Sequence, residues 1–153
     1  MSSEGRERLL RGLHEAQRAS VGQSVLFHHA VAARVGINAT DLNCLNVLEM
    51  HGPLTAGQLA EHTGLTRGGA ITAAIDRLEG AGLLARERDP GDRRRIIVRL
   101  LPEAVARIAP LMPSDVWDEL CADYADDQLA LVLEFTRRSN KIVQGLVERL
   151  AEE

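Results

Sequence analysis

The sequence has few aromatic residues, one lysine, two cysteines and no long apolar run. Aromatics make up only 3% of the chain, so a hydrophobic core must be built from leucine, valine, isoleucine and alanine. Two cysteines are too few for the disulfide framework of a small secreted domain. No apolar run approaches the ~20 residues that cross a bilayer, and the N-terminal MSSEGRERLL lacks the apolar stretch of a signal peptide. We therefore expect a cytoplasmic protein without a membrane partner, and 153 residues suit one ordinary domain.

Motifs for catalysis and metal binding are also missing. The sequence contains no hydrolase, kinase, dinucleotide-binding or P-loop signature, which argues against an enzyme and against a cofactor. No histidine or cysteine pair has the spacing of zinc ligands, and the adjacent His28 and His29 would point ~100° apart on a helix. Cys44 lies on a predicted buried helix, where it is expected to be a small apolar filler and not a redox switch.

Charge is distributed unevenly along the chain, whose net charge is −4. Residues 1–66 carry a net −1 and residues 100–153 a net −6, whereas residues 67–99 hold eight arginines against five acids, a net +3. The basic charge of this middle third comes from arginine alone, because the one lysine is Lys141. Arginine forms forked contacts with phosphates better than lysine does. The asymmetry therefore predicts an anionic partner for the middle third.

The N-terminal part predicts two helices. From Arg6 to Val35 apolar residues recur at three- and four-residue steps, which indicates one helix of ~45 Å that ends before Gly36. Either the whole helix belongs to the core or, as its length favours, part of it packs on a second subunit. A shorter helix follows, with Thr40 expected as its N-cap and its end before Gly52.

A helix-turn-helix is predicted next. Thr55 and Gln58 have the spacing of a capping box and open a helix over residues 56–62. After a short turn that contains a glycine, Thr66 is expected to cap a second helix, which runs to about Ala81.

A hairpin then follows the helix pair. Apolar residues change to a period of two over residues 83–88 and 95–101, which predicts two strands joined by an Asp-Pro-Gly turn. The sequence thus predicts a mainly α protein, a winged helix-turn-helix with a small two- or three-stranded β wing and helical flanks.

The segments that carry this pattern resemble the multiple-antibiotic-resistance regulator (MarR) family of bacterial transcription factors. They are LTAGQLAEHTGLT (54–66), ITAAIDRLEGAGLL (71–84) and DPGDRRRIIVRL (89–100). The last contains the family's wing signature, Asp-x-Arg-x-x-x-Ile/Val, as Asp92, Arg94 and Val98.

The resemblance implies a homodimer and a function. Residues 1–36 and 102–153 would form the helical dimerisation region, and residues 37–101 the DNA-binding lobe. The protein would bind double-stranded DNA at a pseudo-palindromic operator and act as a repressor. The alternative is a winged-helix module that docks protein and not DNA. Salt-dependent binding to a duplex separates the two, and the cationic wing favours DNA.

Helical spacing divides the predicted recognition helix into two faces. One face is apolar and should pack on the preceding helix; it comprises Ile71, Ala74, Ile75 and Leu78. The opposite face offers mostly short side chains, so we expect few direct contacts with bases. Thr72 would act as a short hydrogen-bond donor or acceptor, and Ala73 would contact a thymine methyl group.

Phosphate and minor-groove contacts are expected around this face. Arg67 and Arg77 would grip phosphates, and Gly68 and Gly69 would let the backbone approach a phosphate at the helix N-terminus. By resemblance Arg94 enters the minor groove, while Asp92 holds the wing by an ion pair or a turn cap. The full candidate set is Thr66, Arg67, Gly68, Gly69, Ala70, Thr72, Ala73, Arg77, Asp92, Arg93, Arg94 and Arg95.

A small-molecule effector is a further implication of the resemblance. Members of the family often bind such ligands in a cleft between the dimer region and the DNA-binding lobe. Here Phe27, His28 and Leu48 would line that cleft. The sequence identifies no ligand, and a constitutive repressor is equally open.

Overall fold

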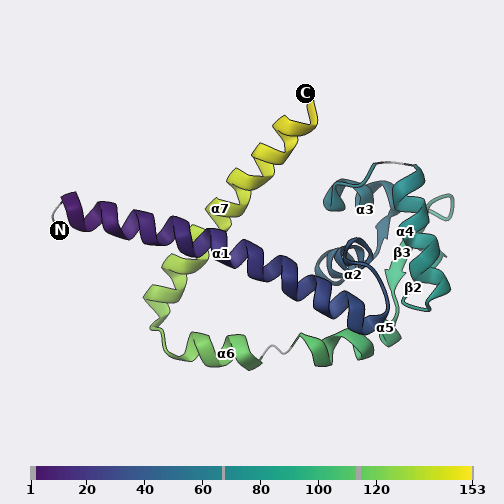
Figure 1. The fold of residues 1–153 in the computed structure, drawn as a ribbon. Coiled ribbons are helices and arrows are strands. Elements are labelled where there is room, and N and C mark those ends of the chain that lie inside the picture. The colour runs from purple at the N-terminus through teal and green to yellow at the C-terminus, as the bar shows by residue number, and fades with distance from the viewer. Residues whose placement is uncertain (1–2, 67, 113–114, 153) are drawn as a thin grey trace. The chain divides into compact units, whose positions relative to one another are not determined.

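The computed structural model describes residues 3–66, 68–112 and 115–152. The chain divides into two compact units, Met1–Met112 and Pro113–Glu153. Figure 1 labels all of their α-helices and the strands β2 and β3. Within the described ranges, no helix combines the length and the apolar character of a membrane span.

The first unit contains a helical scaffold and a small sheet. Its elements are α1 (Ser3–Val35), α2 (Ala39–His51), β1 (Leu54–Thr55), α3 (Ala56–Thr63), α4 (Gly69–Gly80), β2 (Leu84–Arg88), β3 (Ile96–Leu100), α5 (Pro102–Ile108) and a 3₁₀ turn (Ala109–Leu111). The strands form one antiparallel sheet in the order β1-β3-β2. The third strand exists because Leu54 pairs with Val98 of β3, just before the chain enters α3. The predicted fold class, mainly α with a small wing, is confirmed.

The predicted N-cap of α2 is wrong by two residues. The helix starts at Ala39, so Asn38 is the N-cap and Thr40 lies within the first turn. The Asn38 Oδ1 atom accepts a hydrogen bond of 2.8 Å from the backbone N–H of Asp41. An asparagine in extended conformation satisfies a free helix donor in this way, so threonine is not needed for the cap.

The core of the first unit is almost entirely aliphatic, as the shortage of aromatics predicts. Its buried residues come from every element between the end of α1 and α5: Val31, Ala32, Val35, Leu42, Cys44, Leu45, Val47, Leu48, Leu54, Leu59, Ala60, Ile71, Ala74, Ile75, Leu78, Leu83, Leu84, Val98, Ala104 and Ile108. Cys44 is fully buried, as predicted, and this burial together with the nearby Asp41 carboxylate raises the pKa of its thiol to about 11. Only the last turns of α1 contribute to the core.

The second unit consists of α6 (Asp115–Ala122) and α7 (Asp126–Glu152). None of its described side chains is buried. Its exposed large apolar residues are Val116, Trp117, Leu120, Tyr124, Leu131, Val132, Leu133, Phe135, Ile142, Val143, Leu146, Val147 and Leu150. Two helices with this much exposed apolar surface lack the core that an independent unit needs.

Candidate nucleic-acid interface

The first helix of the predicted pair is anchored by the capping box. Thr55 Oγ1 accepts a hydrogen bond of 3.3 Å from the backbone N–H of Gln58, and the Gln58 side chain accepts one of 2.9 Å from the backbone N–H of Thr55. The helix ends at Gly64, whose φ of 71° is left-handed and costs glycine little. The first helix of the predicted helix-turn-helix is therefore confirmed, with its capping box and its end at a glycine.

The start of the second helix, α4, differs from the prediction. Its N-cap is Gly68, which has no side chain that could cap the helix. The backbone N–H of Thr72 donates a hydrogen bond of 3.1 Å to the Gly68 carbonyl. Thr66 is exposed and does not cap the helix, because the helix begins three residues later. Arg67 lies outside the described residues. Gly68 has a φ of 105°, which other residues rarely adopt, and nothing lies within 4 Å of where its Cβ would be.

The two predicted faces of α4 are confirmed. Ile71, Ala74, Ile75 and Leu78 are at most 2% exposed, and the residues between them are exposed. The exposed set is Gly69, Ala70, Thr72, Ala73, Asp76 and Arg77. Short side chains on the outer face let the backbone of α4 approach another surface closely. They leave few long donors for bidentate contacts with bases.

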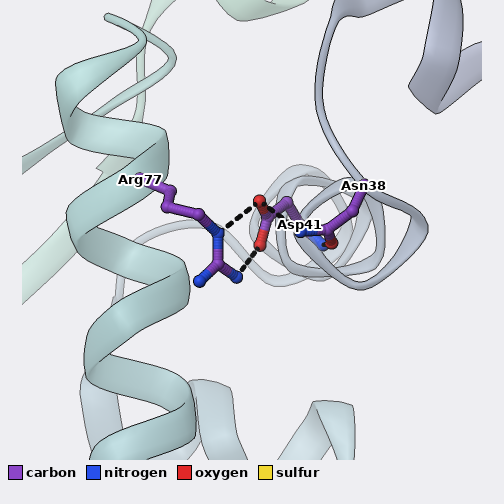
Figure 2. Close-up of polar contacts among 3 residues, drawn as sticks. All are labelled: Asn38, Asp41 and Arg77. Atoms are coloured by element: carbon purple, nitrogen blue, oxygen red, sulfur yellow. Dashed lines mark hydrogen bonds and ion pairs between the residues drawn. The ribbon is translucent and has the colours of Figure 1, made fainter.

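Arg77 has a structural partner that sequence reasoning missed. Its Nε donates to Asp41 Oδ2 at 2.9 Å and its Nη2 to Asp41 Oδ1 at 2.6 Å, so the pair is bidentate and joins α4 to α2 (Figure 2). The Asp41 side chain is 3% exposed and that of Arg77 50%. A buried carboxylate needs such a partner, and donating these bonds to Asp41 raises the pKa of Arg77 above its ordinary value. The phosphate contact of Arg77 stays a prediction: two of its nitrogens bond to Asp41, and half of its side chain remains exposed.

Two more arginines of the basic segment are paired inside the protein. Arg86 of β2 bonds to both Asp76 and Glu79 of α4. Arg99 of β3 donates to Glu87 Oε1 of β2 at 2.6 Å through Nη2 and at 3.0 Å through Nε, and this bond lowers the pKa of the Glu87 carboxyl. These pairs fasten the wing to α4 and join strands β2 and β3 to each other. They neutralise part of the positive charge that the sequence carries in this segment.

The tip of the wing is a tight turn that presents three arginines. The Asp92 carbonyl accepts a hydrogen bond of 2.8 Å from the Arg95 backbone N–H, and Asp92 Oδ1 accepts one of 3.1 Å from that of Arg94. Asp92 Oδ1 also lies 3.4 Å from Arg94 Nε. Asp92 thus both caps the turn and pairs with Arg94. Arg93, Arg94 and Arg95 are all exposed.

Strand alternation holds only in part of β3. Val98 is buried and Leu100 half-buried, as their shared face predicts. Ile96 is 50% exposed although it lies on the same face, because it pairs with Arg88 near the wing tip, beyond the core.

The predicted cleft corresponds to a groove of about 560 Å³ between α1 and α2. It is lined by Ser20, Val21, Ser24, Val25, His28, His29, Ala39, Thr40, Asn43, Thr63 and Leu65. Of the three predicted ligand residues only His28 lines it. Leu48 is 2% exposed and packs in the core, and Phe27, 44% exposed on α1, is not among the lining residues. The prediction that Phe27 and Leu48 line the cleft is therefore wrong, because successive residues of a helix point ~100° apart and only one side of each helix faces the groove.

A helix-turn-helix followed by an arginine-tipped wing defines a winged helix-turn-helix DNA-binding protein. Residues 35–95 match the MarR family profile. The chain is 40% identical over 130 residues, 84% of each chain, to the HTH-type transcriptional regulator YcgE of Bacillus subtilis (strain 168). A MarR family protein from Bacillus stearothermophilus has a similar fold, with a TM-score of 0.67 and 21% identity over 90% of this chain and 97% of that one. The fold of NadR in complex with 4-hydroxyphenylacetate gives a TM-score of 0.60 and 22% identity, over 86% and 91% of the two chains.

The chain therefore belongs to the MarR family of helix-turn-helix transcriptional regulators. It is a DNA-binding protein and not an enzyme. The alternative of a winged-helix module that docks only protein is not supported.

Proposed function

We propose that this chain represses transcription as a homodimer, with the α4 helix of each protomer in the major groove and each Arg94 wing in the minor groove of a pseudo-palindromic operator. The observation that carries the proposal is the wing tip, where the Arg94 side chain is 93% exposed on a turn held by Asp92. A narrow A·T-rich minor groove concentrates negative potential and attracts inserted arginine.

The proposed contact set follows from which residues are exposed and uncommitted. Arg93, Arg94 and Arg95 supply the charge, while Thr72 and Ala73 face the base edges. Ala70, Gly68 and Gly69 allow close approach of the helix N-terminus to a phosphate, and Thr66 lies beside them. Arg67 stays in the set on sequence alone. Because the side chains on the exposed face of α4 are mostly short, much of the sequence specificity would come from the width of the minor groove under the wings.

Exposed apolar surface supports the homodimer. On α1, the large apolar residues exposed before the core begins are Leu9, Leu10, Leu13, Val21, Val25, Leu26 and Phe27. The second unit exposes a comparable set on α6 and α7. Exposed apolar side chains gathered on helices in this way mark an interaction surface and suit burial against a second copy. We therefore assign residues 1–36 and 102–153 to dimerisation and residues 37–101 to DNA binding.

Fluorescence anisotropy of the full chain with labelled duplexes tests the DNA-binding mode. An operator fragment selected from a randomised library should bind far more tightly than random duplex, and protein should protect two half-sites about 10 bp apart. About four phosphate contacts per protomer predict a log–log salt slope near −7 for the dimer. Protection of a single half-site, or binding insensitive to salt, would contradict the proposal.

The α1–α2 groove supports release by a small ligand. Its lining combines the aliphatic Val21 and Val25 with the polar His28 and Asn43, a mixture that suits a small amphipathic molecule. Because NadR is known in complex with 4-hydroxyphenylacetate, that compound is a reasonable first probe. In an in vitro transcription assay, protein alone should lower the yield from a promoter that contains the operator. A ligand of the groove should restore it, whereas it should have no effect on a His28→Trp variant whose groove is filled.

A further inference from the structure

The Asp41–Arg77 pair connects the recognition helix α4 to the buried helix α2 of the DNA-binding lobe. Asp41 is in the first turn of α2, next to the fully buried Leu42, and its carboxylate is aimed at α4 (Figure 2). Oδ2 accepts a second hydrogen bond, of 2.9 Å, from Asn38 Nδ2. Asn38, the N-cap of the same helix, therefore also orients the Asp41 carboxylate that Arg77 binds. The two paired residues are 36 positions apart in the chain.

The other contacts of α4 hold it against the wing and the core, and none that the structure describes is a second ion pair to α2. Asp76 and Glu79 bond to Arg86 of β2, which fastens α4 to the wing. The buried face of α4 consists of aliphatic side chains, and such contacts have little directional preference. Its N-cap, Gly68, provides no side-chain hydrogen bond. A two-point bond between a planar guanidinium group and a carboxylate is directional by contrast, so it fixes both the rotation of α4 about its axis and its distance from α2.

We propose that Asp41 is a positioning residue for operator recognition: through Arg77 it holds α4 at the angle at which its short outer face meets the bases. The inference rests on the proposed placement of α4 in the major groove. The reason is steric, because Thr72 and Ala73 reach only a short distance from the helix. A long side chain can adapt to a small shift of the helix, whereas a methyl or hydroxyl group loses its contact.

A direct phosphate contact by Arg77 is the competing role, and the two roles predict opposite results. If Arg77 binds phosphate, an Asp41→Asn change frees its guanidinium group and strengthens binding to any duplex. If Arg77 positions α4, the same change weakens operator binding, although Asp41 itself is buried and cannot touch DNA. Arg77→Lys keeps the charge but cannot form the two-point bond. It preserves binding in the first case and impairs it in the second.

The experiment measures anisotropy of full-length Asp41→Asn, Arg77→Lys and the double variant with two duplexes, the selected operator and a random sequence. We expect each single change to weaken operator binding about tenfold and the double variant to lose no more than either single one, because both break the same bond. Binding to random duplex should change less than threefold, and the salt slope should stay within about one unit of the original, since no phosphate contact is lost.

Glu87→Gln is the matched control. It breaks a comparable two-nitrogen ion pair, to Arg99, but one that joins two wing strands and not α2 to α4. It should leave the ratio of operator to random-duplex affinity within about twofold of the original. Circular dichroism establishes that each variant is folded at the assay temperature. If Asp41→Asn does not fold, Arg77→Lys alone decides, since Arg77 is half-exposed and its replacement leaves Asp41 a cation.

Three results would overturn the inference. They are an unchanged ratio of operator to random-duplex affinity in Arg77→Lys, tighter binding of both duplexes by Asp41→Asn, and, in either variant, an equal loss of affinity for both duplexes with a shallower salt slope. Failure of the proposed function looks different, because then the unaltered protein would show no preference for any selected operator.

Discussion

The Asp92 carboxylate accepts a hydrogen bond of 3.1 Å from the backbone N–H of Arg94 and lies 3.4 Å from its Nε atom. One side chain thus shapes the turn and orients the arginine two residues away. The Arg94 side chain nevertheless remains 93% exposed. An exposed cation on a turn that Asp92 caps is accessible to the anionic backbone and minor groove of DNA.

Arg94→Ala should weaken operator binding by about tenfold or more, because each protomer loses one arginine from the minor groove. The dimer should stay intact, since Arg94 lies outside residues 1–36 and 102–153, which are assigned to dimerisation. Electrophoretic titration measures the first effect and analytical ultracentrifugation the second. The control is Arg11→Ala, an exposed arginine of α1. If Arg94→Ala titrated like the original protein, the assignment of the wing would be wrong.

Ile142→Asp on α7 should dissociate the dimer. Ile142 is 66% exposed in the chain alone and belongs to the apolar stripe of α7, so a carboxylate there would be buried without a partner on dimerisation. Gln144→Asp adds the same charge on the opposite, polar side of the helix and should leave the dimer unchanged. Sedimentation velocity distinguishes the two. Equal behaviour of both variants would count against this face as the dimer contact.

Leu78→Ala should lower the free energy of unfolding by about 2–5 kcal/mol, because Leu78 is fully buried on the inner face of α4 and its truncation leaves a cavity. Met50→Ala is the control. Met50 is 79% exposed, so its replacement should change the free energy by less than about 0.5 kcal/mol. Urea denaturation monitored by circular dichroism compares the two variants. Similar denaturation midpoints for both would show that α4 does not pack as described.

The thiol of Cys44 should resist alkylation at pH 8, because burial raises its pKa to about 11 and little thiolate forms. The exposed Cys121 should react. The unfolded chain loses its Cys44 proton near the ordinary thiol pKa. Above that pH the unfolded state binds fewer protons than the folded state, so stability should fall as the pH rises towards 11. Cys44→Ala should reduce this fall. Iodoacetamide labelling with mass spectrometry, and denaturation at several pH values, test both expectations; equal labelling of the two thiols would contradict the first.

The sequence by itself determined the local elements. Helical periodicity predicted α1 and the buried face of α4, and the Thr55–Gln58 spacing predicted a real capping box. The Asp-Pro-Gly turn likewise predicted the wing hairpin. These features depend on residues within a few positions of one another, so their spacing carries the information.

Only the tertiary structure decided which arginines are available to DNA. Eight arginines between residues 67 and 99 look alike in the sequence. Folding pairs Arg77 with Asp41, Arg86 with Asp76 and Glu79, and Arg99 with Glu87, while the wing tip stays exposed. The partners lie 7 to 36 positions apart. Helix packing and strand register bring them together, and no local pattern records that choice.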